Sequence, residues 1–166
     1  MLKKFLVAAL LALPICVSAQ DLKFATVNLQ AIFQVMPETS AANAAIQEKA
    51  KQYEDENLKM REELEKKYNE YAAEREILPE NIRVRREQEL QEISQRMENF
   101  MEVARNDIQQ QQEQLIAPIQ EKLMGAVKEV ATEGNYVYVL DEAQVVFKGT
   151  MTEDITPKVK AKLGIQ

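Results

Sequence analysis

Residues 41–78 read AANAAIQEKAKQYEDENLKMREELEKKYNEYAAEREIL, and this stretch decides the fold. Its composition is dominated by Ala, Glu, Lys, Gln, Leu and Arg, which are the strong helix formers. It contains neither Gly nor Pro, and the sequence has no glycine before Gly125. We therefore expect one long, uninterrupted helix, because nothing in the stretch would break it.

The apolar residues of this stretch recur at alternating steps of three and four. The stripe comprises Ile46, Ala50, Tyr53, Met60, Leu64 and Tyr71, with Asn57 and Lys67 in its gaps and Glu74 leading on to Leu78. This is the heptad spacing of a coiled-coil seam. A polar residue such as Asn57 on a seam costs stability but can specify the register of the pairing.

A second periodic run follows Pro79, which predicts a turn over residues 78–81. Its stripe comprises Leu90, Ile93, Met97, Phe100 and Ala104, and then shifts through Ile108 and Leu115 to Ile119 and Leu123. The shift is a stutter, and Pro118 is expected to kink this helix. The two runs predict an antiparallel helical hairpin whose first helix is roughly 55 Å long.

Short elements are expected on both sides of the hairpin. Before the hairpin we expect a strand over 23–28, a brief helix over 29–35 and a helix cap at Thr39 or Ser40. After it we expect the second arm helix to end at Gly134, followed by a β-hairpin of strands 136–140 and 145–147 closed by Gly149. The last element is a terminal helix capped by Thr156, with Pro157 in its first turn.

The fold class is therefore α+β, with a long antiparallel helical hairpin (a coiled-coil arm) on a small β-rich oligomerisation head. Residues 20–166 form one domain, with the head over 20–40 and 131–166, the arm over 41–130, and the arm tip near Pro79. Since a lone three-stranded sheet is only marginally stable, we expect the chain to form oligomers through its head.

The first nineteen residues are predicted to be a secretory signal peptide. Lys3 and Lys4 precede an apolar run, and Val17-Ser18-Ala19 supplies the small residues of a cleavage site. The run is too short to span a bilayer as a helix. A lipoprotein signal built on Cys16 is the alternative, although the preceding Pro14-Ile15 argues against it. We expect an exported protein without an integral membrane span.

The charge balance is acidic. The whole chain has 21 Lys and Arg against 27 Asp and Glu. Removal of Lys3 and Lys4 leaves 19 basic against 27 acidic residues, a net charge of −8. Nucleic acid is therefore not expected as a partner, because phosphate binding needs clustered basic residues.

Catalytic chemistry has little support in the sequence. Histidine is absent, the one cysteine lies in the predicted signal peptide, and no phosphate-binding loop or nucleophile elbow occurs. We expect no enzyme activity, no cofactor and no metal site, and an enzyme is the alternative.

Several short blocks lie near the two ends of the chain. They are Phe24-Ala25-Thr26-Val27-Asn28, Ile32-Phe33, Pro118-Ile119-Gln120-Glu121-Lys122, Ala126-Val127-Lys128-Glu129-Val130-Ala131, Tyr138-Val139-Leu140-Asp141 and Asp154-Ile155-Thr156. As a set they resemble the Skp/OmpH family of periplasmic chaperones, and this resemblance implies a periplasmic location. The likeness extends over the whole mature chain, while the Glu/Lys-rich middle matches any long coiled coil.

This resemblance implies a homotrimer whose heads form a common body from which three arms extend. It also implies a holdase that keeps unfolded outer-membrane proteins soluble without ATP. One feature departs from the family, whose best-known members are basic. Residues 41–130 contain 14 Lys and Arg against 20 Asp and Glu, so the arm has a net charge of −6.

The candidate client-binding residues lie along the arm, where methionines and aromatic rings can adapt to varied partners. They are Met60, Leu64, Tyr68, Tyr71, Met97, Phe100 and Met101. The alternative is that most of them simply hold the two helices together. Tyr68 and Met101 lie beside the stripes and are the better candidates for exposure.

Two further sets of candidates lie at the ends of the arm. The tip set is Leu78, Pro79, Arg83, Arg85 and Arg86, which could contact clients or lipid headgroups or could simply be solvated. The set expected in the head core or at an oligomer interface is Phe24, Val27, Tyr136, Tyr138, Leu140 and Val146. A structural coiled-coil spacer or assembly factor with one fixed partner is the alternative function.

Overall fold

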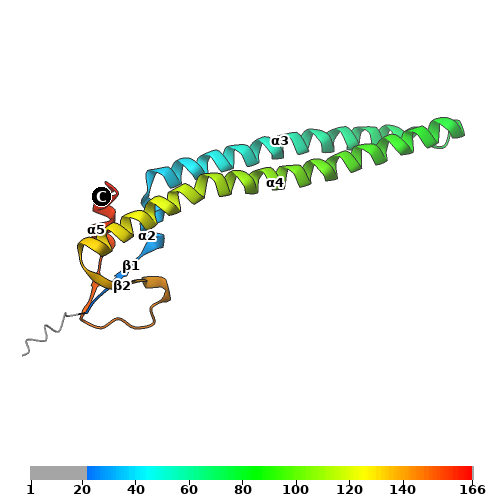
Figure 1. Ribbon diagram of the computed structural model, residues 1–166. Coiled ribbons are helices and arrows are strands. Elements are labelled where there is room, and N and C mark those ends of the chain that lie inside the picture. The colour runs from blue at the N-terminus through cyan, green and yellow to red at the C-terminus, as the bar shows by residue number, and fades with distance from the viewer. Residues whose placement is uncertain (1–21, 166) are drawn as a thin grey trace, which may run out of the picture.

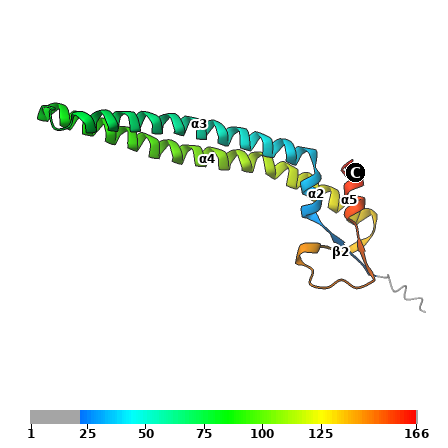
Figure 2. The same cartoon turned by 180° about the vertical axis from the view of Figure 1, so that it is seen from behind.

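A computed structural model describes residues 22–165. The predicted signal peptide, residues 1–19, lies outside this range. The elements are β1 (Lys23–Val27), α2 (Leu29–Val35), α3 (Pro37–Glu74), α4 (Glu80–Glu133), β2 (Tyr136–Asp141), a 3₁₀ turn (Glu142–Gln144), β3 (Thr152–Asp154) and α5 (Thr156–Lys162). The predicted α+β class, with a long helical hairpin on a small sheet, is confirmed (Figures 1 and 2).

The arm is formed by α3 and α4, which lie side by side along their length in both views. At the tip, the backbone N–H groups of Ile77 and Leu78 donate to the Glu74 carbonyl at 3.0 and 3.1 Å. Pro79 then adopts an extended conformation as the N-cap of α4. The turn predicted near Pro79 is therefore confirmed.

The arm helix begins earlier than predicted, so the expected cap at Thr39 or Ser40 is wrong. Pro37 occupies the first turn of α3, where its fixed φ suits a helix and its missing N–H costs nothing. Met36 is extended, as a residue before proline prefers to be. Thr39 is buried within the first turn, where its backbone N–H donates to the Met36 carbonyl at 3.1 Å.

Pro118 lies inside α4, and the helix continues through it to Glu133. Figure 1 shows α4 turning towards the head in its yellow-green part. Gly134 caps α4, as predicted, and its N–H donates to the Val130 carbonyl at 3.0 Å. The left-handed conformation that often follows a helix falls on Asn135 instead, with φ of 54°.

The sheet has the order β2-β1-β3, and β1 pairs in parallel with both neighbours. The predicted β-hairpin over 136–147, closed by Gly149, is therefore wrong. The third strand is Thr152–Asp154, whereas residues 145–147 form no strand. β1 is the central strand and the most deeply buried one, with Ala25, Thr26 and Val27 almost inaccessible.

The last helix begins one residue earlier than predicted, with Ile155 rather than Thr156 as its N-cap. The Thr156 hydroxyl has another partner, because it accepts a hydrogen bond from the backbone N–H of Asn28 at 2.9 Å. The head thus joins the end of β1 directly to the start of α5.

One core lies in the head, between one face of the sheet and the helices around it. Its buried members are Ala25, Val27, Ile32, Met36, Ala42, Ile119, Leu123, Ala126, Val127, Val130, Ile155 and Val159. They come from both ends of the chain, so the head cannot form without either end. Among residues 22–165, no helix is both long and apolar enough to cross a membrane.

Candidate functional site

The seam of the arm follows the predicted heptads. On α3 every predicted position is at least partly buried except Glu74, where the helix ends. On α4, Ile93 and Ala104 are buried, and the intervening seam residues are half-buried. Tyr53 and Phe100 meet edge to face, with ring centroids 5.6 Å apart. Two helices alone leave this seam half open to solvent.

The predicted arm residues divide into two groups. Met60, Leu64, Tyr71, Met97 and Phe100 are half-buried along the seam. Tyr68 and Met101 lie outside it and expose 58% and 44% of their surface. The second group therefore presents apolar surface that the two helices do not use for pairing each other.

One side of the arm is hollowed. Three shallow depressions of about 630, 670 and 630 Å³ lie between α3 and α4 along it. The apolar side chains and seam residues that line them include Ala50, Tyr53, Leu64, Tyr68, Leu90, Met97, Met101, Ala104 and Ile108. We call this side the hollowed side. Sequence reasoning placed Leu90 and Ile108 in the stripes but did not identify them as functional candidates.

The other side, which we call the paired side, is crossed by ion pairs between the two helices. They are Lys49 with Asp107, Lys67 with Glu89, and Glu63 with Arg96. Its one described hollow is lined almost wholly by charged residues. The seam is thus polar and cross-linked on the paired side, and apolar and open on the hollowed side.

Asp107 is the centre of the polar contacts on the paired side. The Lys49 ammonium and the Tyr53 hydroxyl both donate to its carboxylate, the latter at 2.5 Å. These hydrogen bonds hold the pKa of Asp107 below its ordinary value of 3.8, and the same contact with Asp107 raises the pKa of Tyr53. Sequence reasoning missed this group, because its partners are more than fifty residues apart.

We expect the arm to lose stability in acid partly through Asp107. Because the folded-state pKa of Asp107 lies below 3.8, its contribution to the free energy of unfolding is complete above about pH 5. That contribution is lost progressively as the pH falls through the folded-state pKa. Asp107→Asn should therefore unfold at lower urea concentration at pH 7 and lose less stability between pH 6 and pH 3 than the wild type.

The control is Asp55→Asn, which removes an exposed carboxylate that has no ion pair within residues 22–165. Circular dichroism during urea titration at each pH gives the comparison. An unchanged pH dependence in Asp107→Asn would show that the contact does not stabilise the folded arm.

At the tip, Leu78 is half-buried and Pro79 is exposed. Arg83 pairs with Glu80, and Arg86 lies 3.6 Å from Glu89, whereas Arg85 is exposed. Glutamates thus offset two of the three tip arginines. Ile77, which was not predicted, is the most exposed large hydrophobic residue of the described arm.

In the head, the predicted interface residues lie at different depths. Val27 is in the core, while Phe24 and Tyr136 are half-buried. The Phe24 ring stacks on Tyr138 with centroids 6.2 Å apart. Tyr138 and Leu140 are about half exposed or more, and Val146 is fully exposed.

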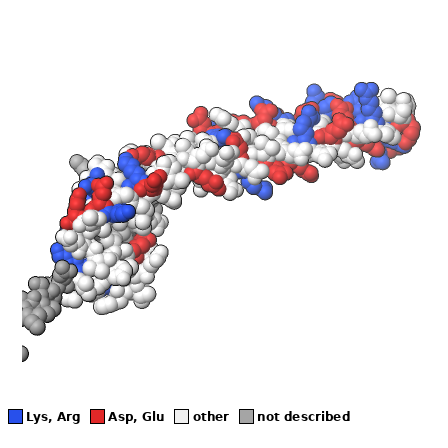
Figure 3. Space-filling model, viewed as in Figure 1, with Lys and Arg blue, Asp and Glu red and all other residues white. Residues whose placement is uncertain are grey.

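The most exposed apolar residues of the head that were not predicted as candidates are Phe147 and Met151. Both lie in the connection from β2 to β3, beside Val146. Figure 3 shows that the lower part of the head carries few charged side chains, in contrast to the mixed charges along the arm. We use the name outer face of the sheet for the exposed apolar residues Tyr138 and Leu140 of β2 together with Val146, Phe147 and Met151 of the connection that follows it.

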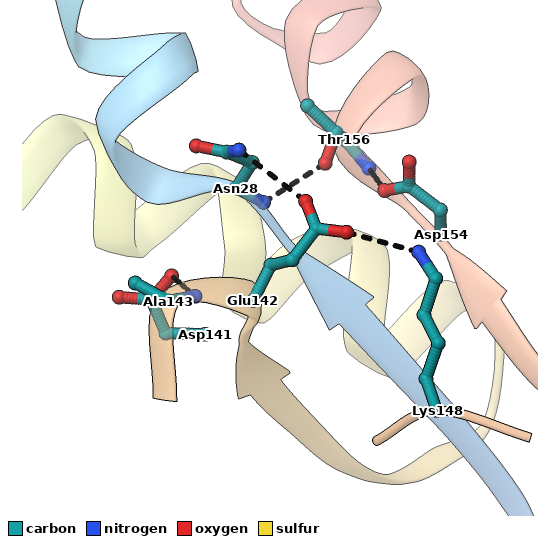
Figure 4. Close-up of polar contacts among 7 residues, drawn as sticks. All are labelled: Asn28, Asp141, Glu142, Ala143, Lys148, Asp154 and Thr156. Carbon is teal, nitrogen blue, oxygen red and sulfur yellow. Dashed lines mark hydrogen bonds and ion pairs between the residues drawn. The ribbon is translucent and has the colours of Figure 1, made fainter. Parts of the chain in front are cut away.

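A polar network joins the carboxyl ends of the three strands (Figure 4). The Asn28 amide and the Lys148 ammonium both donate to the Glu142 carboxylate, at 3.3 and 3.0 Å. Asp154 accepts from the Thr156 N–H at 2.9 Å, and the hydrogen bonds of Thr156 lower the pKa of Asp154. The network ties Lys148, and with it the exposed apolar connection, to the end of β2.

The described part of the chain holds no group of three or more His, Cys, Asp or Glu residues that could bind a metal. The prominent features of the described residues are two surfaces. They are the hollowed side of the arm and the outer face of the sheet.

Comparisons with known proteins agree with this architecture. A sequence model of the family described as "Outer membrane protein (OmpH-like)" matches residues 23–163. The chaperone protein Skp of Yersinia enterocolitica is 28% identical over 160 residues, covering 95% of this chain and 97% of its own. A crystal structure of an OmpH-like protein from Caulobacter crescentus has a similar fold, with a TM-score of 0.74 and 14% identity over 86% of this chain and 83% of that one.

Proposed function

Because this chain belongs to the OmpH-like outer membrane protein family, whose role is that of a chaperone, we propose that it is an ATP-independent periplasmic holdase. Its clients would be unfolded outer-membrane proteins, which it would keep from aggregating after export. Catalysis has no part in this proposal, since the work is done by binding alone.

The observation that carries the proposal is the hollowed side of the arm. It presents apolar and aromatic side chains, Tyr68 and Met101 foremost, on an elongated support that projects from the head. Each depression is shallow, so each contact with a client is weak. Several weak contacts on linked arms would hold a client firmly yet allow release without an energy source.

The outer face of the sheet supports oligomerisation through the head. A monomer rarely leaves several large apolar side chains together in water, and a three-stranded sheet needs cover. Tyr138, Leu140 and Val146, with Phe147 and Met151, would supply this cover in a homotrimer. Three arms would then enclose a common space around one client.

Residues 1–19 would direct export and be removed. The arm tip would contact clients or lipid headgroups through Arg83, Arg85 and Arg86. Glu80 and Glu89 offset two of these three charges.

We expect the purified mature chain to suppress light scattering when a urea-unfolded outer-membrane barrel protein is diluted into it. Suppression should be nearly complete at one trimer per client and should be the same with and without ATP. Unchanged scattering from a chain shown to be folded and oligomeric would contradict the holdase function.

A structural coiled coil with one fixed partner is the second candidate. The three ion pairs on the paired side favour it, because they indicate an arm held in one arrangement. That function predicts no affinity for unfolded chains, so the same scattering experiment separates the two candidates.

A further inference from the structure

We propose that clients bind to the hollowed side of the arm and not to the paired side, and that this surface prefers extended apolar segments that carry Lys or Arg. The inference rests on the proposed holdase function and adds to it the face of the arm and the charge of the bound segment. The preference for basic segments does not follow from the family, because its best-known members have basic arms.

The depressions on the hollowed side form one continuous groove. The depression nearest the arm tip and the middle one share Arg61, Leu64, Ser94 and Glu98 as lining residues. The middle depression and the one nearest the head share Asn57, Met101 and Arg105. On α3 the groove runs from Ala50 to Tyr68, which is about 27 Å at 1.5 Å per residue. An extended segment of about eight residues would fill that length.

The groove is apolar because apolar residues flank the seam on this side, whereas most of the residues that line the hollow on the paired side are charged. Tyr68 follows the seam position Lys67, and Met101 follows the seam position Phe100. Ile108, a residue of the stripe itself, lines the groove together with Met101. The equivalent positions on the paired side include Lys49, Glu63 and Arg96. A stripe widened in this way suits a helix that packs against a further chain as well as its first partner.

Charges at the rim of the groove favour a basic occupant. The charged residues that line it are Glu54, Glu65, Glu98 and Glu102 together with Arg61 and Arg105. Four carboxylates against two guanidinium groups leave a net charge of −2. Among the described residues none of these six forms an ion pair. An incoming ammonium or guanidinium group would therefore meet carboxylates without displacing an existing partner.

An extended segment matches this arrangement. Its side chains alternate between two faces, so apolar residues can enter the depressions while the intervening residues point towards the rim. Lys and Arg at these positions would lie near the rim carboxylates, and their aliphatic stems would cover apolar surface. Asp or Glu at the same positions would be repelled.

The first test uses two soluble peptides of equal length in which apolar residues alternate with Ser and either Lys or Glu. We expect the full-length mature protein to bind the Lys peptide about five-fold more tightly at low salt, corresponding to one or two rim contacts. The difference should shrink in high salt, because exposed charges are screened. Equal affinities at low salt, or tighter binding of the Glu peptide, would overturn the charge preference.

The second test uses matched variants of α4. Met101→Ser lies on the hollowed side and Val103→Ser on the paired side, seven residues after Arg96, and Val103 is the more exposed at 60%. We expect Met101→Ser to weaken peptide binding several-fold and Val103→Ser to leave peptide binding unchanged. The double variant that carries both Tyr68→Ser and Met101→Ser should bind the peptide more weakly than Met101→Ser alone. Equal losses in Met101→Ser and Val103→Ser would overturn the assignment of the face.

A charge-reversal pair completes the design. Glu98→Lys changes the rim of the groove, and Glu92→Lys changes an exposed carboxylate on the paired side of the same helix. The first should abolish or reverse the preference for the Lys peptide, and the second should retain it.

If the wild type binds an unfolded barrel protein but all four single variants behave alike, this inference fails and the holdase function stands. If the wild type binds neither barrel protein nor peptide, the holdase function fails with it.

Discussion

Replacing Ile32 with Ala is expected to lower the free energy of unfolding by about 3 kcal/mol, the middle of the range for a large aliphatic residue truncated in a core. Ile32 lies on α2 and is completely buried in the head core, which the sheet and the helices from both ends of the chain share. Its removal leaves a cavity that none of these elements can fill without losing its own contacts.

Urea denaturation followed by circular dichroism measures this loss. Ile77→Ala is the matched control, because it makes the same chemical change at a tip residue that is 83% exposed. The control should change the free energy of unfolding by less than about 0.5 kcal/mol. Similar losses in the two variants would mean that the head core does not dominate the stability of the fold.

Replacing Asn57 with Leu should have the opposite sign and stabilise the protein by about 1–2 kcal/mol. Asn57 occupies a seam position, and its buried Oδ1 accepts no hydrogen bond from the described residues. Leu at this position would remove an unsatisfied acceptor and would add apolar surface between Tyr53 and Leu64. Most single substitutions destabilise a protein, so a gain here would be distinctive.

The control for this prediction is Asn69→Leu, which makes the same change at an exposed position of α3. It should not raise the midpoint of thermal unfolding, whereas Asn57→Leu should raise it by several degrees. A lower midpoint for Asn57→Leu would indicate that Asn57 is needed to keep the two helices in register.

The arm could be predicted in detail because its determinants are local. The apolar period of 3.5 residues identified the seam, including the polar positions Asn57 and Lys67, and Lys67 is accommodated through its ion pair with Glu89. Pro79 located the turn. The start of α3 was misplaced because two capping residues, Thr39 and Ser40, follow a proline that begins the helix before them.

The head was harder to predict because its determinants are remote in the sequence. Val145-Val146-Phe147 has the composition of a strand, yet Val146 and Phe147 are exposed in the connection between strands. The real third strand, Thr152–Asp154, has little strand character of its own. It is a strand because β1 offers it a free edge, and β1 is more than 120 residues away along the chain.

For the candidate site, the sequence identified the arm residues but not how they divide between the two sides. Tyr68 and Met101 were separated from the seam correctly, because their exposure follows from the heptad alone. The difference between the hollowed and paired sides depends on which residues of α4 face which residues of α3. That alignment follows from the length of the tip turn and cannot be read from either helix alone.

The central place of β1 constrains the order in which the chain can fold. β1 pairs with strands near the other end of the chain, and the Asn28 N–H meets the Thr156 hydroxyl across 128 residues. Closing so long a loop by random search is slow. Pairing of α3 with α4 from the tip inwards shortens the search, because it brings Glu38 beside Lys122. The tip is thus the expected folding nucleus, so that substitutions in the arm should slow folding while substitutions in the head should mainly accelerate unfolding.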